Sequence, residues 1–434
     1  MTSDDAFPHV AQLPLEDPLG LPELSRRLRH THLVWDEHVG GRRRVDLHPL
    51  VLTRRAHEDA RDAALTTCAV ISHATRAAFV SDEEAAHYAF SNPLLALVRA
   101  SSAANDDGRL VRVDLLLGED GRFRACEINA DCPGGLNEAQ GLPDLLKLSG
   151  YKGRTDLTTV VDVLAQRLVA ASGGKGSPRG IVAIVFATAY AEDLQVCALV
   201  ERAVVLAGGR ARRTPPTALS ESDGSCMLGG DVVSVLYRYY PSEHFADLPI
   251  ARAIADLVRA HALTTMSSFA CMFEQSKMAF ARAHALGSGM PPDLAQGLVD
   301  RIPETLLTSD APLLEEREGW VLKRALGRVG DEVFVGALEP EDEWVKLVDG
   351  VRRASAAGEA WIAQRFIRQR TIATPWGPRY LTLGVYVCDG EFCGYYARLT
   401  EVSHTSHDAL VLPVVVAGQA LGAVAAPSRA QVSP

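Results

Sequence analysis

The sequence predicts a mixed α/β (α+β) protein, and two kinds of pattern support this fold class. Residues 109–129 and 380–399 are runs of alternating apolar and polar side chains, each interrupted by a short turn, as in antiparallel hairpins. Residues 180–188, 192–207 and 232–238 instead read as a strand, a helix and a strand, which is typical of alternating α/β units. A chain of 434 residues has enough material for about two or three domains.

The composition is that of a soluble globular protein, with 47% hydrophobic and 23% charged residues. The formal net charge of −10 argues against nucleic acid and anionic membranes as partners. Residues 1–20 are acidic and lack the apolar segment of a signal peptide, and the apolar runs 181–187 and 409–418 are too short to span a bilayer. We therefore expect a cytoplasmic protein.

The eight cysteines form no Cys-x-x-Cys pair and no grouping typical of a zinc site. In a reducing compartment, cysteines are most simply small buried side chains. Cys132 is the exception, because it closely follows the return strand of the first hairpin. A nucleophilic role for Cys132 is the alternative to a structural one.

The first predicted hairpin carries the polar residues of most interest. Its turn, residues 118–121, reads Gly-Glu-Asp-Gly, which favours a tight hairpin loop. If only the two middle residues form this loop, Arg112 faces Glu127 and Asp114 faces Ala125 across the hairpin. A loop one residue longer would turn Glu127 to the opposite face, so the predicted arrangement requires an even loop.

The predicted pairing places Asp114, Glu127 and Asn129 on one side of the hairpin. Two carboxylates and an amide oxygen form a hard, oxygen-only set, which suits Mg²⁺ better than zinc. Arg112 lies beside them, where it can clamp an anion. The alternative is an ordinary solvated face with no ligand.

Two further features have both a functional and a structural interpretation. Lys323 ends a predicted strand and is followed by a glycine turn, residues 327–330, which can cover phosphates with N–H groups and an ammonium. The same pattern is common in hairpins without a ligand. Glu192 and Asp193 begin a predicted helix, where they either stabilise unpaired N–H groups or bind a cationic substrate.

Together these motifs resemble the synthetase domain of glutathionylspermidine synthase, an amide ligase with a circularly permuted ATP-grasp fold. The predicted metal ligands precede the lysines, as in the permuted order of that family. The matching motifs, in the family's order over roughly residues 30–416, are Arg112-Val113-Asp114, Glu127-Ile128-Asn129-Ala130-Asp131, the run YRYYPSE at 237–243, Ser276-Lys277, Val321-Leu322-Lys323 with Gly327-Arg328, Ile362-Ala363-Gln364 and Gly394-Tyr395-Tyr396-Ala397-Arg398.

The resemblance implies an ATP- and Mg²⁺-dependent ligase that joins a small-molecule or peptide carboxylate to an amine through an acyl phosphate. The residue roles that it implies are Mg²⁺ binding by Asp114, Glu127 and Asn129, phosphate binding by Lys277 and Lys323, a phosphate cover at Gly327, Arg328 and Gly330, an adenine pocket at Gln364, and catalysis by Arg112 and Arg398. The alternatives are a catalytically inactive nucleotide-binding protein of the same fold and phosphotransfer to a hydroxyl.

The resemblance also implies a substrate region at Asp131, Cys132, Glu192 and Asp193. The loop that contains Cys132 lacks the serine that helps to bind the peptide in glutathione-using members, which argues against glutathione as the acid. The acidic pair at Glu192 keeps a polyamine or another cationic amine possible. The chain has no room for the additional amidase domain of the bifunctional enzymes, so we expect no hydrolysis of the product.

Five sections follow from these assignments. The predicted sections are a mainly helical region (1–108), the metal-binding hairpin with its following helix (109–150) and a central α/β domain of the pre-ATP-grasp type (151–270). An ATP-binding part (271–416) and a flexible tail (417–434) follow.

Overall fold

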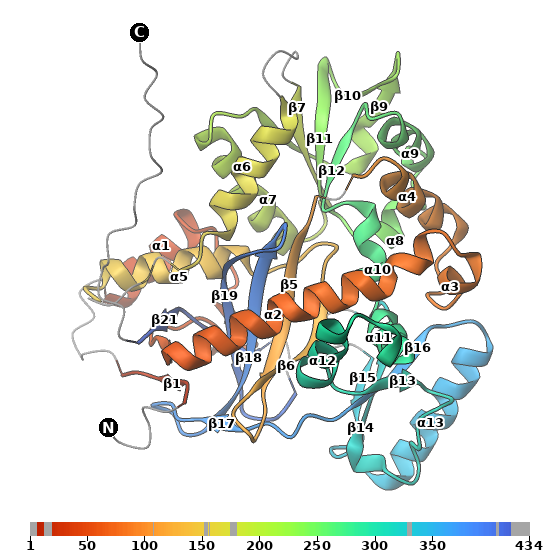
Figure 1. Cartoon of the computed structure of the whole chain (residues 1–434). Helices are drawn as coiled ribbons and strands as arrows, with labels where there is room; N and C mark the ends of the chain where they lie inside the picture. Colours follow the sequence, from red (N-terminus) through yellow and green to blue (C-terminus); the bar gives the residue numbers. More distant parts are fainter. Residues whose placement is uncertain are drawn as a thin grey trace.

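The structure is a computed structural model that describes residues 7–12, 20–106, 108–151, 155, 157–173, 180–327, 332–404 and 408–417. Within these residues, the chain forms three main sheets flanked by helices (Figure 1). The predicted α/β fold class is therefore confirmed. Residues 418–434 of the predicted tail lie outside the described residues, and the five section boundaries stay predictions.

The central sheet combines two hairpins that are far apart in the sequence. Its strand order is β20-β19-β18-β5-β6, and β17 also pairs with β18. The first predicted hairpin forms β5 and β6, and the second forms β18 and β19, so both predictions are confirmed. The strands span Leu110–Leu117 (β5), Phe123–Asn129 (β6), Thr371–Ile372 (β17), Arg379–Cys388 (β18), Glu391–Thr400 (β19) and Leu410–Leu412 (β20).

The loop of the first hairpin is one residue longer than predicted. The backbone N–H of Gly118 donates to the carbonyl of Arg122 at 3.0 Å, and Leu117 pairs with Phe123. Three residues therefore form the tip, where Gly121 has a positive φ of 77° that glycine adopts without strain. By itself, this odd loop would turn the polar side chains of the return strand to the opposite face.

A β-bulge at Cys126 compensates for the longer loop. Leu115 pairs with Ala125, but the next pair along the hairpin is Asp114 with Glu127, so Cys126 is an extra residue of β6. The loop and the bulge each add one residue, and side chains alternate with a period of two. The two additions therefore cancel, and Glu127 returns to the face of Asp114.

The predicted cross-strand partners are thus wrong, although the predicted shared face is confirmed. Arg112 faces Asn129 instead of Glu127, and Asp114 faces Glu127 instead of Ala125. Since these pairs lie two residues apart along each strand, all four polar side chains lie on one side of the sheet.

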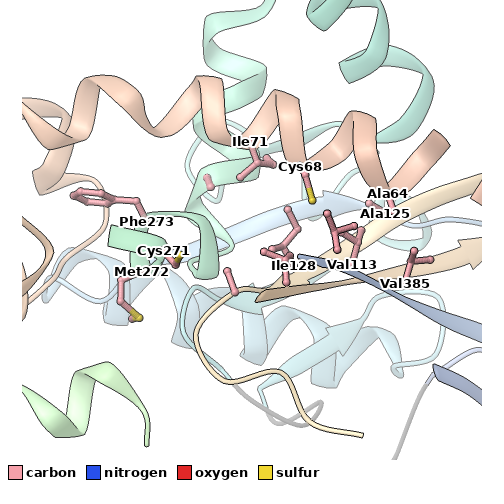
Figure 2. Packing of buried hydrophobic residues seen from close by; sticks show 14 of the residues in the cluster. Ala64, Cys68, Ile71, Val113, Ala125, Ile128, Cys271, Met272, Phe273 and Val385 are labelled. Carbon is pink, nitrogen blue, oxygen red and sulfur yellow. The ribbon is translucent and has the colours of Figure 1, made fainter. Parts of the chain in front are cut away.

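Helix α2 (Arg54–Thr75) covers the opposite, apolar face of the central sheet. Small side chains on this helix, including Ala64 and Cys68, pack over Val113 and Ile128 of the hairpin (Figure 2). Burial of this face fixes the strand register, because a slip of one residue would move the apolar side chains to the polar face of the sheet and the polar side chains under the helix.

The second sheet forms the central α/β part of the chain. Its order is β8-β7-β11-β10-β9, with β12 also paired with β11; β8, β7, β11 and β12 are parallel. Helices α6 and α7 pack against β7. The predicted strand, helix and strand are confirmed as β7, α7 and β11. The elements span Val160–Ser172 (α6), Ile181–Phe186 (β7), Ala191–Leu206 (α7), Ala211–Thr214 (β8), Leu219–Ser222 (β9), Ser225–Leu228 (β10), Asp231–Tyr239 (β11) and Thr264–Met266 (β12).

The third sheet has four antiparallel strands in the order β13-β16-β14-β15 and is covered by helix α13. Trp344 of the helix packs with Trp320 and Leu322 of the sheet, and its Nε1 donates to the carbonyl of Leu313 at 2.8 Å. The elements span Thr305–Leu307 (β13), Trp320–Arg324 (β14), Val333–Val335 (β15), Glu341–Ala356 (α13) and Trp361–Arg365 (β16).

Residues 82–103 contain two helices. The second helix starts after Ser91, whose hydroxyl accepts from the Leu94 N–H, and Pro93 lies in its first turn. Among the described residues, no helix is both long enough and apolar enough to cross a membrane.

The remaining elements are α1 (Gly20–His30), α3 (Asp82–Ala86), α4 (Asn92–Ala103), α5 (Leu136–Leu148), α8 (Ser242–Phe245), α9 (Ala251–Arg259), α10 (Met272–Gln275), α11 (Met278–Leu286), α12 (Pro292–Arg301), β1 (His9–Val10), β2 (His38–Val39), β3 (Arg42–Arg43), β4 (Leu50–Leu52) and β21 (Val414–Val416).

A buried ion pair joins the end of the first hairpin to the α/β sheet. Arg238 of β11 contacts Asp131, and both side chains are fully buried. Asp131 also accepts from the hydroxyl of Ser242 at 2.7 Å, while Arg238 donates to the carbonyls of Tyr240 and Ser267. Because each buried charge has several partners, the pair is satisfied only while both sheets keep their positions.

We expect Arg238→Met to lower the free energy of unfolding by about 3–5 kcal/mol, because it leaves the Asp131 carboxylate buried without its cation. Urea denaturation of the full chain measures this change. Arg259→Met is the matched control, since the Arg259–Asp256 pair is exposed and is expected to contribute about 1 kcal/mol or less. Equal midpoints for the two variants would show that the buried pair does not hold the sheets together.

Candidate functional site

A pocket lies between the central sheet and the four-stranded sheet. It holds about 960 Å³ of atom-free space, part of which is open to solvent. One wall comes from β5, β6, β18 and β19, and the other comes from β14, β15 and β16 with the segment that follows. The predicted metal ligands, both predicted lysines, both predicted arginines and Gln364 all line this pocket.

Asp114 is the centre of a cluster on the central sheet. It accepts from Arg112 Nε at 2.7 Å and Nη2 at 3.0 Å, and from Arg398 Nη2 at 2.6 Å. The amide Nδ2 of Asn129 donates to the same carboxylate at 3.3 Å. Burial alone would raise the pKa of Asp114, but the two guanidinium groups outweigh it and hold this pKa at about 2. Asp114 is therefore an anion at all physiological pH values.

Glu127 lies across the hairpin from Asp114 and pairs with a lysine from outside the sheet. Lys277 Nζ is 3.0 Å from Glu127 Oε1 and also donates to the carbonyl of Gly327 at 2.7 Å. The lysine side chain is only 4% exposed, whereas that of Glu127 is 25% exposed. Glu127 therefore keeps an accessible side toward the pocket.

Lys323 reaches the same region from β14 of the other sheet. Its Nζ donates to Gln364 Oε1 at 2.6 Å and to the carbonyl of Cys126 at 3.0 Å. Gln364 is held in turn, because its Nε2 donates to the hydroxyl of Thr305 at 3.2 Å. Burial lowers the pKa of Lys323, and the nearby charge of Lys277 lowers it further. Gln364, predicted to line the adenine pocket, thus also fixes the position of Lys323.

A tyrosine and two glycines surround the two arginines. The guanidinium carbons of Arg112 and Arg398 lie 5.5 and 5.4 Å from the centroid of the Tyr396 ring, within cation–π range. Gly135, at φ +85°, packs so closely that a Cβ atom would lie 2.9 Å from this ring. A Cβ on Gly384 would lie 2.8 Å from Arg112 Cδ. Sequence reasoning missed Gly384, which has no side chain and therefore leaves room for Arg112 on the neighbouring strand.

The segment that leaves β16 is bound to the tip of the first hairpin. The N–H of Glu119 donates to the carbonyl of Arg368 at 3.0 Å, and the N–H of Arg370 donates to that of Leu117 at 2.9 Å. These two bonds form a backbone seam that joins the two walls of the pocket at one end.

The sequence missed the apolar part of the pocket and one histidine. Leu116, Phe366 and Ile367 line it, together with three valines of β14 and β15. Leu116 was recoverable, because it lies two residues after Asp114 on the same face of a strand. His404 also lines the pocket, and burial, aided by the charge of Lys323, lowers its pKa.

Four residues of the predicted substrate region lie elsewhere. Asp131 is buried against Arg238, and the Cys132 thiol donates to Asp131 at 3.7 Å. Glu192 is exposed and Asp193 partly buried in the first turn of α7. Their roles in substrate binding stay predictions. Of the predicted phosphate cover, Gly327 accepts the bond from Lys277, while Arg328 and Gly330 lie outside the described residues.

The hairpin carries oxygen atoms of the type that Mg²⁺ binds, and in this structure both Asp114 oxygens accept from Arg112 and Arg398 while Asn129 contacts Asp114 through its amide nitrogen. Among the described residues, no three His, Cys, Asp or Glu side chains are grouped to hold a metal, so Asp114 and Glu127 reach a third donor only through Asn129. Mg²⁺ is commonly held by one or two carboxylates together with substrate phosphates and water. Two carboxylates and one amide are therefore enough protein ligands for this ion. The cationic neighbours of these carboxylates suit those phosphates.

The chain is similar to several known proteins. A family model described as glutathionylspermidine synthase preATP-grasp matches residues 22–417. The fold is similar to that of a glutathione synthetase-like effector from Globodera pallida in its apo form, with a TM-score of 0.61 and 13% identity over 94% of this chain and 99% of that chain. A putative gamma-glutamylcysteine synthetase from Methylobacillus flagellatus KT aligns at 12% identity and a TM-score of 0.41, over 82% of this chain and 84% of that one.

No curated protein matches the sequence. The expected ATP-grasp-like fold is confirmed by the family match and by the similarity to the effector. Because the family model spans nearly the whole chain, the chain belongs to the glutathionylspermidine synthase preATP-grasp family.

Proposed function

We propose that this chain is a cytoplasmic ligase that uses ATP and Mg²⁺ to join a carboxylate to an amine. The observation that carries the proposal is the meeting, in one pocket between two sheets, of an acidic cross-strand pair with four cationic side chains. The pair is Asp114 and Glu127 on the hairpin. The cations are Arg112, Lys277, Lys323 and Arg398. The ligase character of the family supports the same conclusion.

The two parts of the pocket suit the two parts of ATP. Leu116, Phe366 and Ile367 offer an apolar wall for the adenine ring. Lys277 and Lys323 offer ammonium groups for the phosphates, beside oxygen donors that suit Mg²⁺. When bound, Mg²⁺ would neutralise phosphate charge and orient the transferring group.

The chemistry is a transfer in two steps. A carboxylate oxygen of the acid attacks the γ-phosphorus of ATP; the bond to the bridging oxygen breaks, and ADP leaves with the electron pair. The amine nitrogen then attacks the acyl carbon, loses a proton, and displaces inorganic phosphate to give the amide. Negative charge develops first on the phosphoryl group and then on the tetrahedral adduct, so Arg112 and Arg398 are suited to stabilise both.

The substrates that we propose are a small-molecule or peptide carboxylate and an amine. Glu192 and Asp193, at the start of α7, supply negative charge for a cationic amine. The alternative is a nucleotide-binding protein without ligase activity. Two arginines on one carboxylate favour the ligase, because nucleotide binding alone does not require a second guanidinium there.

We expect Arg398→Met to slow amide formation by about 10²-fold or more while leaving nucleotide affinity nearly unchanged, because it removes charge stabilisation of the transition state. Lys323→Met should instead weaken nucleotide binding by about tenfold or more, since it removes a charged hydrogen bond to phosphate. ADP release with pooled acids and amines, mass spectrometry of the product and calorimetric titration with an ATP analogue measure these effects.

Lys346→Met on the exposed face of α13 is the matched control for these variants, because Lys346 is 65% exposed, pairs with Asp342 and Glu343 of its own helix, and does not line the pocket. It should leave both readouts unchanged. ATP-analogue binding with no amide from any acid and amine pair would favour the inactive nucleotide-binding protein. No binding of the analogue at all would overturn the nucleotide site itself.

We expect nucleotide affinity to fall at alkaline pH earlier than for a site with an ordinary lysine. Phosphate binds the ammonium form of Lys323, and burial lowers the pKa of this group, so the ammonium is lost as pH rises through that lowered value. Calorimetric dissociation constants from neutral to alkaline pH measure the effect. Lys323→Met should bind more weakly but lose this part of the pH dependence; an unchanged profile in the variant would contradict the assignment.

A further inference from the structure

We infer that the Lys277 ammonium competes with a divalent cation for Glu127, so that nucleotide phosphates, by accepting this ammonium, strengthen metal binding at Glu127. Lys277 would then couple the binding of the two cofactors. This inference rests on the proposed function, since it assumes that phosphates and a divalent cation bind in this pocket.

The Lys277 side chain is held against Glu127 and is not a mobile surface group. Its ammonium is 3.0 Å from Glu127 Oε1 and donates to the Gly327 carbonyl, and its backbone N–H donates to the carbonyl of Ala325 at 2.9 Å. The side chain is 4% exposed. An ion pair at this burial is weakly screened by solvent and competes with any other ligand of the carboxylate.

The chain segment that carries Lys277 is tied to the hairpin that carries Glu127. Gln275, two residues earlier, accepts from the backbone N–H groups of Ala130 and Asp131 at 2.8 and 2.9 Å. These bonds fix the two residues that follow β6 against α10. The Lys277–Glu127 contact is therefore a property of the folded site, and it reforms whenever no ligand competes for the ammonium.

The two lysines of the pocket differ in what they bind without a ligand. Lys323 donates to two neutral oxygens, those of Gln364 and the Cys126 backbone. Lys277 instead pairs with a carboxylate that is a predicted metal ligand. A phosphate oxygen can therefore accept a further hydrogen bond from Lys323 while Lys323 keeps its neutral partners. On Lys277, a phosphate oxygen must instead replace the Glu127 carboxylate.

The charges couple metal binding at Glu127 to phosphate binding at Lys277. A divalent cation at Glu127 would lie close to the Lys277 ammonium, and like charges at contact distance in a partly buried site repel strongly. Nucleotide phosphates remove this repulsion, because they accept the ammonium and add negative charge beside the metal. By linkage, the nucleotide strengthens metal binding by the same factor as the metal strengthens nucleotide binding.

The test is the affinity of the full chain for Mn²⁺, followed by electron paramagnetic resonance in the absence of nucleotide. We expect Lys277→Met to bind Mn²⁺ about tenfold or more tightly than the natural chain, because the competing ammonium is gone. Lys346→Met is the control; it removes an exposed lysine of α13 that does not line the pocket, and it should leave the affinity unchanged. Lys277→Gln, which keeps a polar side chain, should behave as Lys277→Met does.

Three further measurements separate the outcomes. Glu127→Gln added to Lys277→Met should abolish the gain, which shows that Mn²⁺ binds at Glu127. A non-hydrolysable ATP analogue should tighten Mn²⁺ binding to the natural chain, after correction for Mn²⁺ held by free analogue, and should do so much less in Lys277→Met. Equal Mn²⁺ affinities for the natural chain and both Lys277 variants would overturn the inference. Absence of any amide product would contradict the proposed ligase without altering these binding results.

Discussion

Side chains of a β-strand alternate between two faces, so one extra residue in β6 decides which side chains face the pocket. That residue is Cys126, and its bulge brings Glu127 opposite Asp114 despite the long loop. The carbonyl of Cys126 also accepts a bond from Lys323 of the neighbouring sheet. The bulge thus aligns the acidic pair and connects it to the second wall of the pocket.

The described site holds more cationic than anionic side chains, and both of its carboxylates are paired with cations. Two arginines neutralise Asp114, and Lys277 pairs with Glu127. In a chain with a formal net charge of −10, this cationic group is a local exception, which suits an anionic cosubstrate. The pairs also explain how a pocket with so many ionised groups stays folded without ligand, because each buried charge has an opposite charge or a hydrogen-bond partner.

The alternation of the hairpin was enough to predict that Arg112, Asp114 and the polar residues of β6 share a face. The register was not predictable, because Gly121 suits a three-residue tip as well as a two-residue loop, the bulge at Cys126 has no sequence signature, and their effects cancel. The burial of Asp131 was also unpredictable, since its partner Arg238 belongs to a strand 107 positions away. Spacing arguments see local periodicity, whereas such pairs depend on how distant sheets meet.

The backbone seam between the tip of the first hairpin and residues 368–370 has a mechanical consequence. The two walls cannot part at that end without breaking main-chain bonds, so a relative motion of the sheets would be a rotation with its axis there. The lever arm grows along β6, from its start at Phe123 to its end at Asn129. Such a hinge would hold the apolar end of the pocket nearly constant and widen or narrow the end where the charged groups gather.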